Sequence, residues 1–89
     1  MEIITKIRFE KDIKKCKKRD KDFKKLETVL KKLVDSKTLE EKYRNHPLVG
    51  NWNPCWELHI EPDWLLIYYI DTKNNQLILY RTGSHSDLF

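Results

Sequence analysis

The spacing of hydrophobic positions changes along the chain, and each change marks a different kind of element. Residues 2–9 hold three isoleucines and Phe9 in an extended pattern, which predicts a first strand running into a helix near Phe9. From there to about residue 39, apolar residues recur every three or four positions, which is the period of an amphipathic helix. We therefore expect one strand and then helices in the first half.

Two apolar stripes divide the helical region, and the charged run 19–22 separates them. The stripes consist of Phe9, Ile13 and Cys16, and then of Phe23, Leu26, Leu30, Leu33 and Val34. Either aspartate of the charged run, Asp20 or Asp22, can cap the second helix. The pattern predicts two amphipathic helices in an antiparallel hairpin, with the lysines directed outward.

The second half of the chain has the alternation of strands. Residues 43–54 hold two of the three prolines and one of the two glycines, and they predict a loop. In the strand that follows, Trp56, Leu58 and Ile60 point one way, so His59 faces away from the apolar set. Turns are expected at 61–64 and 71–75, strands at 64–70 and 76–82, and one helical turn from residue 83.

These elements predict a single α+β domain over residues 1–89. An N-terminal strand, a two-helix hairpin and a three-stranded antiparallel meander would form a four-stranded sheet, with the helices on one face and the other face free. The length suits one small core. On the free face or at its rim, side chains from the turn at 61–64 and from the end of the last strand can converge.

The charge of the chain is divided unequally between its two halves. The first 44 residues hold 16 of the 18 Lys and Arg residues against nine acids, a net charge of +7, and the rest carries −3. One interpretation is a solvated helix surface. The other is a field that attracts RNA or an acidic protein, in which Lys14, Lys17, Lys18 and Lys21 would take part.

Cellular location follows from what the sequence lacks. No apolar run approaches the ~18 residues that span a bilayer, and the N-terminal residues resemble no hydrophobic signal. Cys16 and Cys55 form no CxxC pair, which favours two reduced thiols. We expect a cytoplasmic protein without a membrane partner.

The candidate chemistry lies in the second half, where all three histidines occur: His46, His59 and His85. Imidazole can both take and give a proton near neutral pH. Cleavage of an RNA phosphodiester requires removal of the 2′-hydroxyl proton, stabilisation of the charged transition state and protonation of the departing 5′-oxygen. Two imidazoles and the guanidinium of Arg81 can meet these needs without a metal or another cofactor.

Each of these residues also has a simpler interpretation. Arg81 can form a surface ion pair, and His46 or His59 can be ordinary surface residues. His85 can open a Ser-capped helical turn, while Asp63 can be a turn residue or can orient an imidazole.

Two further alternatives concern aromatic side chains and metals. Trp64 and Phe89 can belong to the core, although Phe89 can also stack on a base. The spacings His59-x3-Asp63 and Arg81-x3-His85 lack a zinc pattern, and a guanidinium opposes a bound cation. We expect no metal ligand.

Several runs resemble the YafQ branch of the RelE/ParE toxin superfamily over residues 43–89. They are His46-Pro47-Leu48, Gly50-Asn51-Trp52, the run from His59 to Tyr68 and the run from Arg81 to Phe89. The resemblance implies a compact RelE-like fold and an endoribonuclease that acts chiefly on mRNA in the ribosomal A site. It also implies a small antitoxin as partner, acidic in the part that binds the toxin.

By position, the resemblance assigns roles to individual residues. His46, His59, Asp63 and His85 are similar to the family's acid–base group, and Arg81 to its phosphate-contacting arginine. Trp64 and Phe89 match aromatic positions that hold substrate. One departure is the run Trp56-Glu57-Leu58-His59, because relatives usually carry a basic residue at its first position.

The leading hypothesis is therefore a metal-independent endoribonuclease toxin of a type II toxin–antitoxin system. Two other classes remain open at this point. One is a non-catalytic RNA- or ribosome-binding module that uses the lysine-rich helices, and the other is a toxin relic that only binds an antitoxin.

Overall fold

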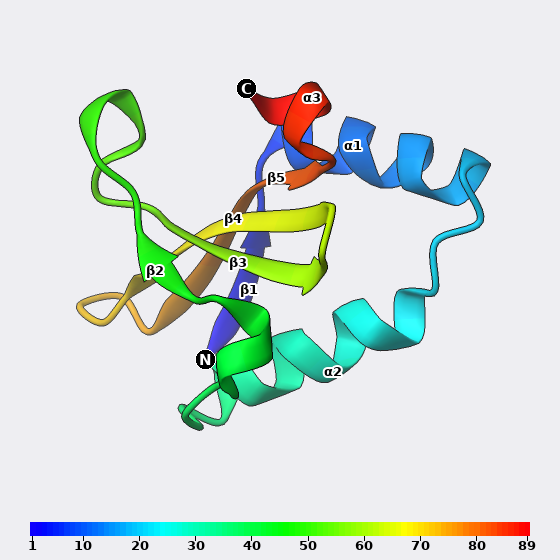
Figure 1. Cartoon of the computed structure of the whole chain (residues 1–89). Coiled ribbons are helices and arrows are strands. Elements are labelled where there is room, and N and C mark those ends of the chain that lie inside the picture. The colour runs from blue at the N-terminus through cyan, green and yellow to red at the C-terminus, as the bar shows by residue number, and fades with distance from the viewer.

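A computed structural model describes residues 1–89 and shows an α+β fold (Figure 1). Three α-helices, two short 3-10 helices and five strands follow one another along the chain. In order, they are β1 (Glu2–Thr5), α1 (Ile7–Lys18), α2 (Phe23–Val34), η1 (Glu41–Tyr43), β2 (His46–Pro47), η2 (Gly50–Trp52), β3 (Trp56–Glu61), β4 (Trp64–Asp71), β5 (Gln76–Gly83) and α3 (His85–Leu88). None of the helices is long and apolar enough to span a bilayer.

The sheet has five strands in the order β1-β5-β4-β3-β2, so the expected count of four was wrong. The added strand is β2, where His46 pairs with Glu57 and Pro47 with Trp56. Two residues are too few to show an alternating pattern, which explains why the region was expected to be only a loop. The meander β3-β4-β5 is antiparallel as expected, and β1 lies parallel to β5.

The first strand is shorter than its composition suggests. It ends at Thr5, and α1 begins at Ile7, two residues before the expected position at Phe9. The phase of α1 is set by Phe9 and Cys16, which are buried seven residues apart on its inner face. Ile7 is off that face and is 73% exposed.

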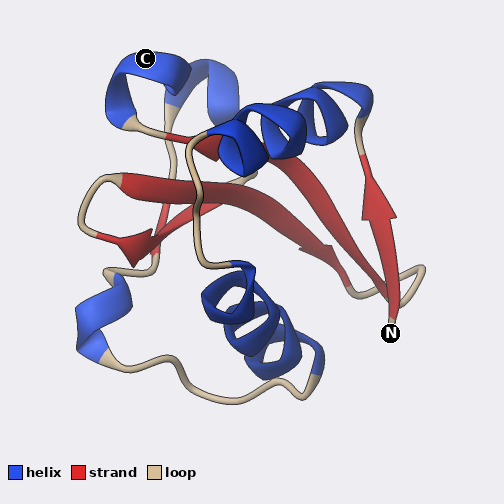
Figure 2. Ribbon diagram, turned by 90° about the vertical axis from the view of Figure 1, so that its right-hand side faces the viewer, coloured by secondary structure: helices blue, strands red, loops and turns tan.

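Helices α1 and α2 do not form the closely packed hairpin that was expected. Helix α1 packs against β5, whereas α2 packs against β3, and Figure 2 shows the two helices separated along the sheet. The linker between them contains Asp20, which has a left-handed backbone (φ 54°). Asp22 caps α2 by accepting a hydrogen bond from the backbone N–H of Lys24. Each helix is thus held mainly by the sheet.

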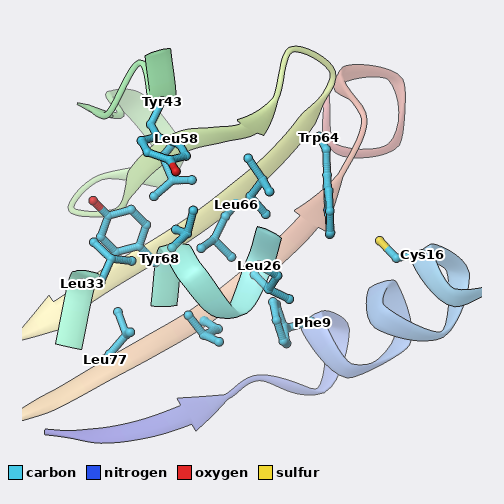
Figure 3. Close-up of a cluster of buried hydrophobic side chains, with 13 residues drawn as sticks. Phe9, Cys16, Leu26, Leu33, Tyr43, Leu58, Trp64, Leu66, Tyr68 and Leu77 are labelled. Carbon is cyan, nitrogen blue, oxygen red and sulfur yellow. The ribbon is translucent and has the colours of Figure 1, made fainter. Parts of the chain in front are cut away.

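The main core lies between these helices and one face of the sheet (Figure 3). It contains the inward residues of α1 and α2 together with Leu58, Leu66 and Leu77 from the strands. Trp64, at the start of β4, is fully buried in it. Burial of these side chains supplies the largest favourable term in folding.

The second face of the sheet is partly covered, so the expectation of a free face was wrong. Helix α3 and the segment around η2 pack over it. The residues of this smaller cluster are Cys55, Leu65, Ile67 and Leu88, with Leu48, Trp52, Tyr69 and Tyr80 packed against them. The candidate acid–base residues lie on this second face, at the edge of the region that α3 and the η2 segment cover.

Candidate active site

His85 is held at the start of α3 by Asp63 from the β3–β4 turn. One carboxylate oxygen, Oδ1 of Asp63, accepts from the backbone N–H of His85 at 2.9 Å and lies 2.7 Å from its Nδ1. These bonds lower the pKa of Asp63, so the carboxylate is charged at neutral pH. A charged carboxylate only accepts, so Nδ1 carries a proton and Nε2 remains available for exchange. Asp63 thus orients an imidazole, as one of its two interpretations predicted.

His59 lies on β3, and its ring centre is 5.6 Å from that of His85. Its Nδ1 is 3.2 Å from the carbonyl oxygen of Pro62. A carbonyl can only accept, so Nδ1 is the donor here too, and Nε2 is the atom that can exchange a proton. His59 is only 9% exposed, and its geometry is therefore fixed by packing as well as by this bond.

His46 completes a row of three imidazoles along the site. Its ring centre lies 6.5 Å from that of His59, and its Nδ1 is 2.6 Å from the carbonyl oxygen of Arg44. Arg44 has a left-handed backbone (φ 47°), which turns the chain into β2. In all three rings Nδ1 is therefore the donor atom, and Nε2 makes no hydrogen bond.

Glu57 is a functional candidate that the sequence analysis did not select. One of its oxygens, Oε1, lies 3.5 Å from Nε2 of His46 and 3.5 Å from Nε2 of His59. Its side chain is 7% exposed. The sequence could have identified Glu57, because Glu57 and His59 are two residues apart in a strand and therefore lie on the same face of the sheet.

Arg81 is engaged in an ion pair rather than free. Its Nε and Nη2 donate to Asp12 of α1 at 2.7 and 3.1 Å, and the two side chains are 11% and 12% exposed. Asp12 also accepts from the backbone N–H of Thr82. Arg81 thus forms an ion pair, but the pair is largely buried rather than on the surface as expected, and its partner is 69 positions away in the chain.

The two aromatic candidates have opposite environments. Trp64 is fully buried and donates from Nε1 to the hydroxyl of Thr82 at 2.9 Å, so its ring offers no surface to a substrate. The expectation that Trp64 contacts substrate directly was wrong. Phe89 is 62% exposed beside the site, with its ring edge-on to Trp52 at 6.3 Å.

The four lysines selected from the sequence also divide into two kinds. Lys14, Lys17 and Lys18 are exposed on α1 and have no carboxylate partner. Lys21 instead lies 3.4 Å from Glu61 and 5.7 Å from the centre of the Trp64 ring. It is only partly exposed, so the expectation of a lysine free to bind a polyanion was wrong for Lys21.

A hollow of about 730 Å³ lies elsewhere on the molecule. It lies beyond the C-terminal end of α2, and its lining includes Leu33, Arg44, Trp56 and Tyr68 but none of the candidate acid–base residues. Substrate would therefore approach the imidazole row at an open rim. No group of three or more His, Cys, Asp or Glu side chains is arranged to hold a metal ion.

Comparison with known proteins places this chain in one class, the toxins of bacterial type II toxin–antitoxin systems. A family model described as "Bacterial toxin of type II toxin-antitoxin system, YafQ" matches residues 1–89. The mRNA interferase toxin YafQ of Escherichia coli K12 is 40% identical over 82 residues, which are 91% of this chain and 87% of that relative. The chain belongs to the YafQ family, and as a member it is an endoribonuclease.

Solved structures agree with this assignment. A metal-bound toxin from Helicobacter pylori is 42% identical with a TM-score of 0.94, covering 100% of this chain and 99% of that one. YafQ in the E. coli DinJ-YafQ complex is 37% identical with a TM-score of 0.88, covering 99% and 97%. The resemblance stated for residues 43–89 is thus confirmed and extends to the N-terminal helices.

Proposed function

We propose that this chain, as a single domain over residues 1–89, cleaves mRNA in the ribosomal A site by metal-independent acid–base catalysis. The observation that carries the proposal is the fixed row of imidazoles, in which each Nδ1 is bonded to an oxygen of the protein and no Nε2 makes a hydrogen bond. Such an arrangement offers several proton-exchange positions within one phosphodiester's reach.

The proposed reaction needs one proton acceptor and one proton donor. A neutral Nε2 takes the 2′-hydroxyl proton, the 2′-oxygen attacks the adjacent phosphorus, and a protonated imidazole gives its proton to the departing 5′-oxygen. The products are a 2′,3′-cyclic phosphate, which can open to a 3′-phosphate, and a 5′-hydroxyl. His59 and His85 are the closest pair of rings and are assigned these two transfers, with His46 beside them.

The remaining residues bind, orient or stabilise charge. Glu57 faces the Nε2 atoms of His46 and His59, each 3.5 Å from its Oε1, and helps to orient these two rings. Arg81 contacts the phosphate through the guanidinium nitrogen that is not bonded to Asp12, and Phe89 stacks on a base. Trp64 acts only through the core.

Two partners belong to this proposal. The ribosome and its mRNA are the substrate complex, which places the protein in the cytoplasm. A small antitoxin that is acidic in its toxin-binding part is the inhibitor, in keeping with the DinJ-YafQ complex of E. coli. The net charge of +7 in the first 44 residues complements both.

Cleavage is expected to persist when transition metals are removed. No group of three or more His, Cys, Asp or Glu side chains is arranged to hold a metal ion, and both proton transfers are assigned to side chains. Chelation followed by restored magnesium keeps the ribosomes intact, and mRNA cleavage on programmed ribosomes is then measured. Added Zn²⁺ should inhibit, because a ligated Nε2 cannot exchange a proton.

The H. pylori relative with a bound metal makes this experiment informative. Cleavage that is lost on chelation and recovered only with zinc or manganese would reverse the assignment. A parent protein that binds ribosomes without cutting would favour the non-catalytic module instead.

The exposed lysines of α1 are expected to supply affinity. Neutralising Lys14, Lys17 and Lys18 together should weaken ribosome association and flatten its salt dependence by about 0.7–0.9 in log–log slope for each phosphate that is no longer neutralised. Ribosome binding across a salt series is the measurement. Lys31, an exposed lysine on α2 without a carboxylate partner, gives the matched control Lys31→Gln. An unchanged salt slope in the triple variant would identify these lysines as ordinary solvated surface.

A further inference from the structure

Two carboxylates flank the Asp63–His85 pair symmetrically, although neither belongs to the acid–base group. Glu61 is the last residue of β3 and precedes Asp63 by two residues, and Asp87 follows His85 by two residues in α3. Both are bonded to basic side chains from residues 15–25. These side chains come from the end of α1, the linker after it and the first turn of α2.

Asp87 is held from two sides. Its carboxylate receives Nη1 and Nη2 of Arg19 at 2.6 and 3.1 Å, with Nζ of Lys15 at 3.7 Å. It also accepts from the backbone N–H of Ser84 at 2.9 Å, which completes a capping box for α3. Gly83 makes this possible, because a Cβ there would lie 2.9 Å from Oδ2 of Asp87. The bond from Arg19 is the main reason that the pKa of Asp87 is far below its usual range.

Glu61 is held in the same manner from the other helix. Nζ of Lys25 lies 2.8 Å from one of its oxygens, and Nζ of Lys21 lies 3.4 Å from the other. Hydrogen bonds from both lysines, with Lys25 first, lower the pKa of Glu61. Figure 1 shows the linker descending from α1 to α2 on the side toward which the β3–β4 turn points.

The Asp63–His85 pair needs such support from outside. The side chains of His85 and Asp63 are 56% and 67% exposed, and a solvent-exposed contact of this kind contributes little to stability. Helix α3 has four residues, too few to be stable without tertiary contacts. The hydrogen bond from His85 to Asp63 therefore cannot by itself fix two surface turns against each other.

We propose that the linker between α1 and α2, together with the first turn of α2, is a brace that holds Asp63 against His85. Arg19 fixes the His85 turn through Asp87, and Lys21 and Lys25 fix the Asp63 turn through Glu61. Arg19, Lys21 and Lys25 are positioning residues and contact no substrate. The effect on cleavage rests on the function proposed above, whereas the effect on the geometry of Asp63 and His85 does not.

The brace also divides the basic residues of this region into two groups with different roles. Lys14, Lys17 and Lys18 have no internal partner and are available to a polyanion, whereas Arg19, Lys21 and Lys25 are already engaged. Variants of Lys14, Lys17 or Lys18 should therefore alter ribosome binding. Variants of the brace should instead alter the cleavage rate on saturated ribosomes.

The test uses Arg19→Ala, Asp87→Asn and the double variant, with Lys31→Ala as control. An asparagine can still accept from the N–H of Ser84, so Asp87→Asn removes the ion pair and spares the cap. The first readout is the pKa of the Asp63 carboxyl, followed by carbon-13 NMR without RNA. It should rise toward the ordinary aspartate value in each brace variant, because the N–H groups of His85 no longer hold the carboxylate.

The second readout is single-turnover cleavage on saturated ribosomes. The brace variants should lose about 10- to 100-fold in rate, the scale for a small misplacement of reacting groups, with ribosome affinity unchanged. The double variant should lose no more than the worse single variant, and Arg19→Lys should recover part of the rate. The control should match the parent.

An Asp63 pKa that stays at the parental value in both Arg19→Ala and Asp87→Asn would overturn the brace, as would parental cleavage rates in both. If Arg19→Ala does not fold, the Asp63 pKa and the single-turnover cleavage rate are measured on Asp87→Asn and Arg19→Lys instead. A parent that does not cleave RNA would refute the proposed function alone, because the NMR titration still decides the brace.

Discussion

Replacing His59 or His85 with alanine should lower the single-turnover cleavage rate by about 100- to 10,000-fold, the range for general acid–base groups. The two rings are the closest pair in the site, and each has a hydrogen-bonded Nδ1 and an Nε2 that makes no hydrogen bond. Ribosome binding should change far less. The losses should not add in the double variant, because two groups that serve one reaction give overlapping penalties.

Three measurements on each variant make this prediction decisive. Ribosome affinity, thermal stability and cleavage rate are followed in parallel, so that a folding defect is separated from a chemical one. Tyr80→Phe on β5 provides a control of similar bulk, since no hydrogen bond or ion pair holds the Tyr80 hydroxyl, although Nζ of Lys6 lies 5.5 Å from the centre of its ring. A folded double histidine variant that cleaves at the parental rate would eliminate the mechanism.

Replacing Trp64 with alanine should lower the free energy of unfolding by about 3–5 kcal/mol, as for other large buried aromatic side chains. The ring is fully buried, packs edge-on against Phe23 at 6.2 Å and donates to Thr82. Chemical denaturation monitored by circular dichroism measures the loss. A substrate-binding role would show instead as weaker binding in a protein of normal stability.

Two other substitutions sharpen the comparison. Trp56→Ala removes a ring that is 39% exposed and should cost much less stability. Trp64→Phe keeps most of the packing while removing the N–H donor, so its cleavage rate per folded molecule should stay near that of the parent. Parental stability in Trp64→Ala would contradict the assignment of this residue to the core.

Most of the fold could be predicted because periodicity carries the information. The meander β3-β4-β5 and both long helices follow directly from spacings of two and of three to four residues. Periodicity does not specify which elements pair or pack against one another. The two-residue strand β2 and the separation of α1 from α2 depend on contacts between distant segments, and neither has a local signature.

The candidate site shows the same division. The meeting of His59, Asp63 and His85 was predictable, because one turn and one strand end must lie side by side in a meander. The state of Arg81 was not, since its partner Asp12 belongs to a helix 69 positions earlier. Sequence spacing indicates which residues can reach a site, whereas availability depends on partners that only the folded chain supplies.

The parallel pairing of β1 with β5 also affects the order in which the molecule can be assembled. Ile3 pairs with Leu77, so this ladder closes nearly the whole chain into one loop, and such long-range contacts form late and slowly. On a translating ribosome, His59 and Asp63 emerge well before His85. The nascent chain therefore has no Asp63–His85 pair until residue 85 has emerged, so the proposed acid–base group would be incomplete while the residues before it are being made.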